Sequence, residues 1–242
     1  MTLTRAIILS AGLGTRMRPL TDTVPKPLIA VNGKPLIDHC LDWVEAAGIT
    51  DVVINTSYLA QRLEDHLRRR ASPVIYFSRE EPAPLETGGG IAKALPFLGD
   101  KPFLAMNSDA LFPKTSVHPV ARLAAAWDDA LDFLMLVVPK DKALGWAGNG
   151  DFILNAAGEL RRAKEGEEAP YIFTGVEIIH PRVFQDNPGG AFSLNYYWKK
   201  LARADGFHDR MRAVVHEGDW LNVGDLAGLK VAETYSTTGI LA

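Results

Sequence analysis

The chain has almost no cysteine, with one, Cys40, among 242 residues. A single thiol excludes an intramolecular disulfide framework and every metal cluster built from several cysteines. Long apolar runs are also missing, since none approaches the roughly 18 residues that a membrane span needs. The apolar stretch at residues 6–9 is too short for a secretory signal. We therefore expect a cytoplasmic protein that does not bind membranes.

Neither sign of charge is in large excess, because the chain has 26 lysines and arginines and 29 aspartates and glutamates. The formal charge of −3 provides no general basic field for nucleic acid, so any anionic ligand must be held by local side chains. Hydrophobic residues make up 47% and charged residues 23%, which is typical of a globular domain and excludes a disordered chain. The length favours one hydrophobic core over residues 1–242.

Short apolar runs alternate with amphipathic segments through residues 1–140. Strands are predicted at residues 6–9, 52–54, 74–77, 103–106 and 133–137, and helices at 35–47, 59–70, from 87 and at 120–127. This alternation predicts right-handed βαβ units. We expect an α/β, Rossmann-like, doubly wound domain with a mixed, mainly parallel sheet, whose ligands bind at the carboxyl ends of the strands.

The alternation of strands with helices does not continue through residues 145–242. Strands predicted at 152–154, 159–162 and 171–179 are joined by short polar turns, which indicates a small antiparallel flap. Helices at 194–204 and 226–235 and a strand at 212–216 complete the chain. No repeat, linker or domain boundary is evident, so we expect one domain made of these two parts.

A glycine turn follows the first strand, where residues 12–18 read GLGTRMR. Glycines directly after a buried strand let backbone N–H groups approach a polyphosphate. Met17 in the third glycine position excludes a dinucleotide-binding fingerprint and so a Rossmann-type reductase, and no Gly-Lys-Ser/Thr completes a Walker loop. Pro25 and Pro27 fix the backbone on either side of Lys26. The pattern predicts a triphosphate site with two or three separate cations.

Together with PLT at 19–21 and PKPL at 25–28, this turn resembles the signature of the sugar-1-phosphate nucleotidylyltransferases. The likeness continues in order through LETGGG at 85–90, NSD at 107–109, FTG at 173–175 and WLNVG at 220–224. It implies nucleotidyl transfer from an NTP to a sugar 1-phosphate with release of pyrophosphate, dependent on Mg²⁺. UTP and N-acetylmuramate 1-phosphate are the favoured substrates. A guanylyltransferase for mannose or heptose 1-phosphate, and an inactive nucleotide-sensing subunit, remain alternatives.

The resemblance also implies a set of site residues. Arg16 would hold the β- and γ-phosphates, Lys26 would bridge the α-phosphate and the sugar phosphate, and Asp109 would hold Mg²⁺. The nucleotide would contact Ala11, Gly12, Gly14, Thr15, Arg16, Lys26, Thr87, Gly88 and Asn107. The contacts of Thr87 and Gly88 depend on a helix that begins near Thr87. The free N–H groups and small residues at its start would let a flat base approach.

The sugar would contact Asn107, Asp151, Thr174 and Gly175. The Glu-Lys-Pro run that holds the sugar phosphate in many relatives is not evident, because residues 164–166 read KEG. The second metal ligand, an aspartate in relatives, is Asn222 here, and we expect Asp225 to cap the last helix instead. We expect a monomer or small homo-oligomer, with no nucleic-acid partner.

Overall fold

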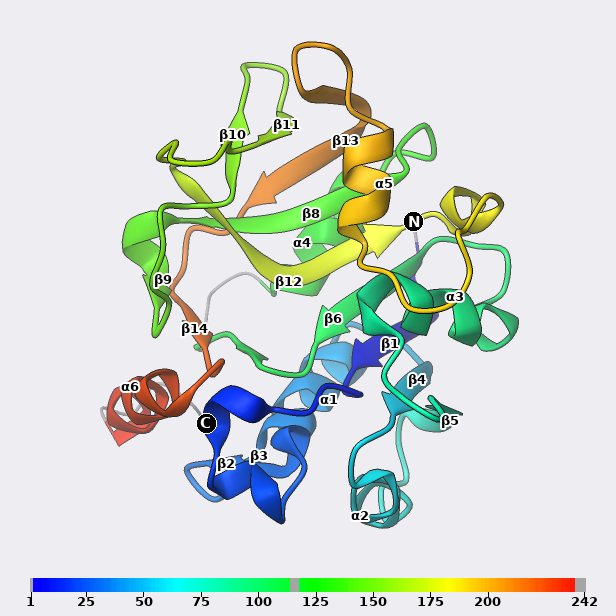
Figure 1. The fold of residues 1–242 in the computed structure, drawn as a ribbon, viewed down its shortest axis with the longest axis vertical. Helices are drawn as coiled ribbons and strands as arrows, with labels where there is room; N and C mark the ends of the chain where they lie inside the picture. The colour runs from blue at the N-terminus through cyan, green and yellow to red at the C-terminus, as the bar shows by residue number, and fades with distance from the viewer. Residues whose placement is uncertain (1, 114–117, 238–242) are drawn as a thin grey trace.

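The computed structural model describes residues 2–113 and 118–237 (Figure 1). Its main sheet has the strand order β10-β11-β13-β8-β12-β6-β1-β4-β5. These strands are β1 (Arg5–Leu9), β4 (Asp51–Thr56), β5 (Val74–Arg79), β6 (Phe103–Asn107), β8 (Phe133–Pro139), β10 (Phe152–Leu154), β11 (Glu159–Arg162), β12 (Tyr171–Ile179) and β13 (Phe207–Val215).

Most of the long strands run in one direction. β6, β1, β4 and β5 are parallel neighbours, and β13 is parallel to β8. β12 runs antiparallel between β6 and β8. This confirms the predicted mixed, mainly parallel sheet, and it places the carboxyl ends of β1, β4, β5 and β6 at one edge.

Helices cover both faces of the sheet, because its inner strands are apolar on both sides. In β1, Ile8 packs into one core with α1 (Leu36–Ala46), α2 (Ala60–Leu67) and α4 (Pro119–Ala126), while Ile7 packs into the other. The second core contains residues of α3 (Glu86–Leu98) and α5 (Asn195–Lys200). Side chains that alternate between two buried faces explain why the strand is continuously apolar.

A smaller unit lies beside this sheet. β14 (Trp220–Asn222) pairs with β7 (Ala110–Leu111) and β9 (Ala143–Leu144), and α6 (Leu226–Thr237) lies next to it in Figure 1. β2 (Ala30–Val31) and β3 (Lys34–Pro35) form a hairpin near the same end. Among the described helices, none combines the length and apolar character needed to cross a bilayer.

The flap differs in detail from the prediction. β10 and β11 form its antiparallel hairpin, and β11 extends the sheet by pairing with β13. The strand expected at 171–179 is β12, which only touches β10 at Tyr171 and otherwise lies in the centre of the sheet. The reason is its apolar run, since Val176 and Ile178 pack into one core and Ile179 into the other. α5 is also shorter than the helix predicted at 194–204.

Candidate functional site

A cavity of about 220 Å³ opens at the carboxyl edge of the parallel strands. It lies where β1, β4, β5 and β6 end and α3 begins, which is where open α/β sheets bind ligands. We call it the main cavity. Its lining residues are Leu9, Ser10, Ala11, Gly12, Lys26, Pro27, Asn55, Glu80, Pro84, Glu86, Thr87, Asn107, Ser108 and Asp109.

The glycine turn forms one wall of the main cavity. Gly14 has φ +64°, a left-handed conformation that favours glycine, and a Cβ there would lie 3.1 Å from the Cβ of Lys26. The hydroxyl of Thr21 donates to the Gly14 carbonyl oxygen at 2.8 Å and holds the turn against that lysine. The N–H groups of Gly12 and Leu13 meet no acceptor within the described part of the chain. They are free to donate to an anion.

Lys26 lies in a short 3₁₀ turn, Lys26–Leu28, closed by a hydrogen bond of 2.8 Å from the Leu28 N–H to the Pro25 carbonyl oxygen. Its Nζ donates to Oδ2 of Asp109 at 2.5 Å, and both side chains are largely buried. The structure therefore brings two of the predicted catalytic residues together at the cavity wall. The carboxylate holds the ammonium in one place, so the cation is aimed at the cavity before any ligand binds.

Arg16 lies in the 3₁₀ turn Thr15–Met17, which the fully buried Met17 anchors. Its guanidinium is exposed and forms no ion pair with any described residue. A Cβ added at Gly224 would lie 3.6 Å from Nη1 of Arg16 and 3.4 Å from Oδ1 of Asn222. Arg16 and Asn222, which are far apart in sequence, thus flank the same glycine.

Asn222 also lies beside Asp109. Asn222 pairs with Ala110 in the ladder of β14 and β7, and the Val223 N–H donates to the Asp109 carbonyl oxygen at 3.2 Å. A carboxylate and an amide supply the hard oxygens that Mg²⁺ prefers. The described residues contain no group of three or more His, Cys, Asp or Glu side chains that could hold a metal. The residues present fit a magnesium ion whose other ligands come from a bound phosphate or water.

The neutral amide of Asn222 leads to a prediction. Asn222→Asp should lower the Mg²⁺ concentration for half-maximal activity roughly tenfold, because it adds a negative charge beside Asp109, and a tenfold change equals about 1.4 kcal/mol. Asp225 accepts a hydrogen bond of 2.9 Å from the Gly228 N–H and caps α6, as expected. Asp225→Ala should therefore cost about 1 kcal/mol of unfolding free energy and leave the Mg²⁺ dependence unchanged. Mg²⁺ titrations and thermal melts of both variants check this, and the opposite pattern would assign Asp225 as the ligand.

The start of α3 differs from its prediction at Gly88. The Gly88 N–H donates to the Phe192 carbonyl oxygen at 2.8 Å, and a Cβ at Gly88 would lie 2.4 Å from the Phe192 ring. The expectation that this N–H is free for a nucleobase was wrong, because the glycine lets a distant segment pack against the helix. Thr87 does line the main cavity, and its Oγ1 accepts a hydrogen bond of 2.9 Å from the Leu194 N–H.

A buried polar chain that was not predicted runs along the wall of the main cavity. The Ser10 N–H donates to Oδ1 of Asn55 at 2.6 Å, and Nδ2 of Asn55 donates to Oε1 of Glu80 at 2.8 Å. The other Glu80 oxygen accepts from the Leu85 N–H at 2.6 Å, and Glu80 is only 1% exposed. This chain ties the ends of β1, β4 and β5 to the start of α3. A signal was available, because Asn55 and Glu80 both follow predicted strands at their carboxyl ends.

Glu86 was also missed. It has φ +59°, a backbone conformation that non-glycine residues rarely adopt, and it lines the main cavity. Within the described residues its carboxylate has no hydrogen-bond or ion-pair partner. Strained residues of this kind concentrate at functional sites, and Glu86 lies in the LETGGG run at 85–90, although it was not singled out there.

On the side predicted for the sugar, neither Thr174 nor Gly175 is among the residues that line the main cavity, but Gly175 lies against Asn107, which does line it. Gly175 has φ +78° at a bulge of β12, and a Cβ there would lie 2.5 Å from Nδ2 of Asn107. Thr174 is 1% exposed, and its hydroxyl donates to the Leu136 carbonyl oxygen at 2.8 Å. This hydroxyl is therefore used within the sheet at the bulge, and a contact of Thr174 with a sugar stays a prediction.

Asp151 lies just before β10, apart from the residues that line the main cavity. Its Oδ2 accepts a hydrogen bond of 3.0 Å from the Phe173 N–H. Burial raises its pKa above the usual range for an aspartate. The carboxylate thus supports the start of β12, two residues before Gly175. A contact between Asp151 and a sugar stays a prediction.

Comparison with known proteins agrees with this geometry. The family model described as nucleotidyl transferase matches residues 5–147. The N-acetylmuramate alpha-1-phosphate uridylyltransferase of Caulobacter vibrioides is 43% identical over 233 residues, which are 94% of this chain and 95% of the relative. The enzyme of the same name from Neisseria meningitidis serogroup B is 37% identical over 95% of this chain and 96% of the relative.

Solved structures share the fold. The inositol-1-phosphate CTP transferase from T. maritima superposes with a TM-score of 0.80 at 18% identity, covering 100% of this chain and 99% of that one. HddC from Yersinia pseudotuberculosis, complexed with GMP-PN, gives a TM-score of 0.75 at 22% identity, covering 97% and 100%. With the matched family model and the two full-length relatives, these findings show that the chain belongs to the nucleotidyl transferase family, as the resemblance in its motifs predicted.

Proposed function

We propose that this protein transfers a uridylyl group from UTP to N-acetylmuramate 1-phosphate, giving the UDP-sugar and pyrophosphate. The choice of substrates is supported by the two full-length relatives that carry this activity in their names. The observation that carries the chemistry is the Lys26–Asp109 pair on the wall of the main cavity, beside the free amides of the glycine turn.

The reaction needs no covalent intermediate on the protein. A phosphate oxygen of the sugar 1-phosphate forms a bond to the α-phosphorus of UTP, and the bond from that phosphorus to the bridging α–β oxygen breaks. Pyrophosphate leaves with the electron pair. The work of the protein is then to align the two phosphates and to neutralise the charge that develops between them.

Different residues at the main cavity align the phosphates and neutralise the developing charge. The amides of Gly12 and Leu13 donate to the triphosphate, and Arg16 neutralises its β- and γ-phosphates and the departing pyrophosphate. Lys26 stabilises the charge on the α-phosphate as the new bond forms. Bound Mg²⁺, held by Asp109 and Asn222, would supply further positive charge to the phosphates. The polar chain through Asn55 and Glu80 keeps the ends of the strands in register.

The base and the sugar occupy opposite ends of the site in this proposal. Thr87 and the start of α3 contact the base, and Asn107, Gly175 and the flap contact the sugar. Residues 1–140 thus bind the nucleotide and contribute Asn107 to the sugar, and residues 145–242 bind the rest of the sugar and close the site. We also propose a cytoplasmic location and a monomer or small homo-oligomer.

A guanylyltransferase is the second candidate. The mannose-1-phosphate guanyltransferase of Schizosaccharomyces pombe is 39% identical over 126 residues, but these are 50% of this chain and 33% of that enzyme. The match covers only half of this chain, so it supports this candidate less than the two full-length relatives support uridylyl transfer. An inactive nucleotide-sensing subunit is disfavoured, because Arg16, Lys26 and Asp109 are all retained.

A pyrophosphate-release screen tests the proposal. The four NTPs are each combined with a panel of sugar 1-phosphates, with Mg²⁺ or with a chelator. We expect the highest rate with UTP and N-acetylmuramate 1-phosphate and no release without Mg²⁺, and mass spectrometry should identify the UDP-sugar. A preference for GTP would make the protein a guanylyltransferase. Nucleotide binding without release from any pair would indicate the sensing subunit.

A further inference from the structure

The side chain of Glu80 connects two segments that lie on different sides of the main cavity. Its Oε1 accepts a hydrogen bond from Nδ2 of Asn55, and its Oε2 accepts one from the Leu85 N–H. Asn55 in turn accepts a hydrogen bond from the N–H of Ser10, the residue that leads from β1 into the glycine turn. One carboxylate therefore joins the beginning of that turn to the residue that precedes α3.

Each hydrogen bond in this chain has a fixed direction. The Ser10 N–H can only donate, so Asn55 must present its amide oxygen to Ser10 and its NH₂ group to Glu80. Carboxylate oxygens accept, and both oxygens of Glu80 are used. A glutamine at this position has one acceptor oxygen, so it could accept from Asn55 or from Leu85 but not from both. The chain therefore requires a carboxylate at position 80 as long as position 55 is an asparagine.

The surroundings of Glu80 hold its carboxylate in this place. The residue is 1% exposed, and no lysine, arginine or histidine that the structure describes forms an ion pair with it. A Cβ added at Gly90 of α3 would lie 2.5 Å from Oε1 of Glu80 and 2.9 Å from Nδ2 of Asn55, so the glycine makes room for the pair. Burying a carboxylate without a cation destabilises a fold. Departures of this kind are expected where function requires them.

The backbone that Glu80 holds leads directly into the wall of the main cavity. Leu85 is followed by Glu86, which has φ +59° and lines the cavity together with Thr87. The hydrogen bond between the Leu85 N–H and Glu80 fixes the chain one residue before this strained position. The position of the α3 end of the cavity is thereby set relative to the ends of β4 and β5, and through Asn55 relative to the glycine turn.

We propose that Glu80 is a positioning residue for the nucleotide. Its carboxylate sets the distance between the glycine turn, which holds the triphosphate, and the start of α3, which contacts the base. A ligand that spans both segments binds more tightly when their separation is fixed before it arrives. Glu80 acts through Asn55 and Leu85 and not on the reacting phosphates. This role rests on the proposed function, because it requires an NTP in the main cavity.

Exchanging the amide and the carboxylate tests this role. Glu80→Gln leaves two donors facing each other, and Asn55→Asp leaves two acceptors facing each other. We expect each single variant to raise the Kd for UTP by about tenfold or more, because an unpaired buried polar group displaces the segments that it joined. Calorimetry on the full-length protein with Mg²⁺ measures the Kd, and thermal melts show that each variant is folded at the temperature used.

The double variant Asn55→Asp/Glu80→Gln should restore most of the affinity for UTP. The new aspartate accepts from the Ser10 N–H and from the NH₂ group of the new glutamine, and the oxygen of that glutamine accepts from the Leu85 N–H. Every donor has an acceptor again, and the net charge equals that of the wild type. A double variant that binds UTP no better than the single variants would overturn the proposal.

Gly90→Ala perturbs the same pair without removing either partner. Alanine is a better helix former than glycine, so the variant should fold. Its methyl group would push the Glu80 carboxylate away from Asn55, so we expect a raised Kd for UTP here too. This variant keeps the test decisive if a single exchange does not fold.

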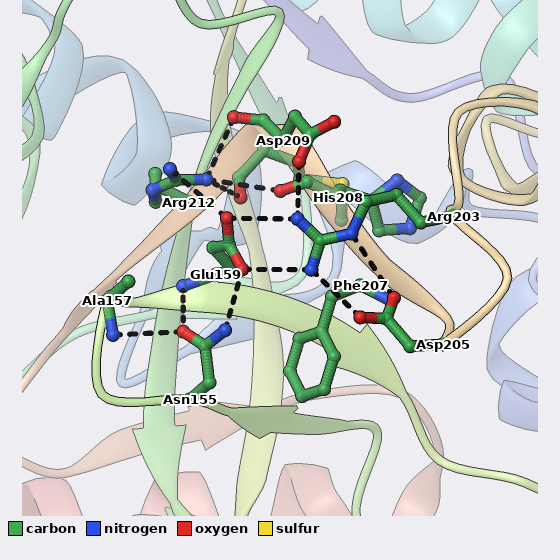
Figure 2. A network of polar contacts seen from close by, with 10 residues as sticks. Asn155, Ala157, Glu159, Arg203, Asp205, Phe207, His208, Asp209 and Arg212 are labelled. Atoms are coloured by element: carbon green, nitrogen blue, oxygen red, sulfur yellow. Dashed lines mark hydrogen bonds and ion pairs between the residues drawn. The ribbon is translucent and has the colours of Figure 1, made fainter.

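Glu159 provides the matched control, because it also accepts a hydrogen bond from an asparagine. Nδ2 of Asn155 donates to its Oε2 at 2.6 Å, and the carboxylate pairs with Arg203 and Arg212 in the network that Figure 2 shows. Neither Asn155 nor Glu159 lines the main cavity. Glu159→Gln should therefore lower the melting temperature and keep the wild-type Kd for UTP.

The measurements separate this role from the proposed function. Lower melting temperatures with an unchanged Kd for UTP in the Glu80 and Gly90 variants would show that Glu80 has only a structural role. An equal rise of the Kd in Glu159→Gln would also overturn the proposal. If the wild type binds another NTP in place of UTP, the same comparison is made with that NTP. A wild type that binds none of the four would overturn the proposed function and this role together.

Discussion

Lys26→Ala should lower kcat by about 10²-fold or more while changing the affinity for the NTP much less. The loss expected on removing one preorganised donor to a developing charge is about 10²–10³ in kcat. Lys26 meets the α-phosphate, where the geometry changes during the reaction, so its contribution is largest in the transition state. The amides of Gly12 and Leu13, together with Arg16, still hold the triphosphate in the variant. The measurements are kcat by pyrophosphate release and Kd for UTP by calorimetry.

This substitution also leaves Asp109 without its partner, which calls for a matched control. Lys34 forms a half-exposed ion pair with Asp42 of α1, which Arg70 also contacts, away from the main cavity. Lys34→Ala therefore removes a lysine–aspartate pair without touching the site, and it should keep the wild-type kcat. Near-wild-type turnover in Lys26→Ala would show that Lys26 has only a structural role. An equal loss in both variants would show that the effect comes from folding.

The features that were predicted correctly are encoded by neighbours in the sequence. The buried β1, the glycine turn after it and the proline-flanked Lys26 lie within about two dozen residues, and local backbone preferences determine their form. The apolar alternation of strands and helices was enough to predict the parallel sheet and its ligand-binding edge. Asp109 lies at that edge because it comes just after β6, and there it pairs with Lys26, a contact that was not itself predicted.

What could not be predicted depends on contacts between distant segments. No residue near Gly88 in the sequence indicates that its N–H donates to the Phe192 carbonyl oxygen. Likewise, no residue near Thr174 indicates that its hydroxyl donates to the Leu136 carbonyl oxygen. Both contacts follow from the packing of α5 on α3 and the insertion of β12 beside β8. The position of β12 could not be predicted from the sequence either. A continuous apolar run is compatible both with a central strand of the sheet and with a flap strand that is covered on both faces. Burial patterns identify strands, but they do not specify their partners.

Because β12 lies at the centre of the sheet, one of its side chains places an ionisable carboxyl group in the core. Glu177 is 2% exposed, lies between Ala105 of β6 and Met135 of β8, and its Oε2 has no hydrogen-bond partner among the described residues. Burial raises the pKa of Glu177 from 4.5 to about 8. The folded protein therefore keeps this carboxyl protonated over a range in which the unfolded chain releases the proton.

Glu177→Gln should consequently remove a large pH dependence of stability. Between about pH 4.5 and pH 8 the folded state binds one more proton at this group than the unfolded state, so the free energy of unfolding falls as pH rises. The slope from one such group reaches about 1.4 kcal/mol per pH unit. The glutamine variant cannot titrate, so its stability relative to wild type should grow by several kcal/mol between about pH 5 and pH 8. Urea unfolding at pH values across this range measures the difference, with Glu165→Gln, an exposed glutamate on the flap, as the control for charge removal. Parallel stability curves for wild type and Glu177→Gln would contradict the assignment, because they would mean that the carboxyl ionises in the core without cost.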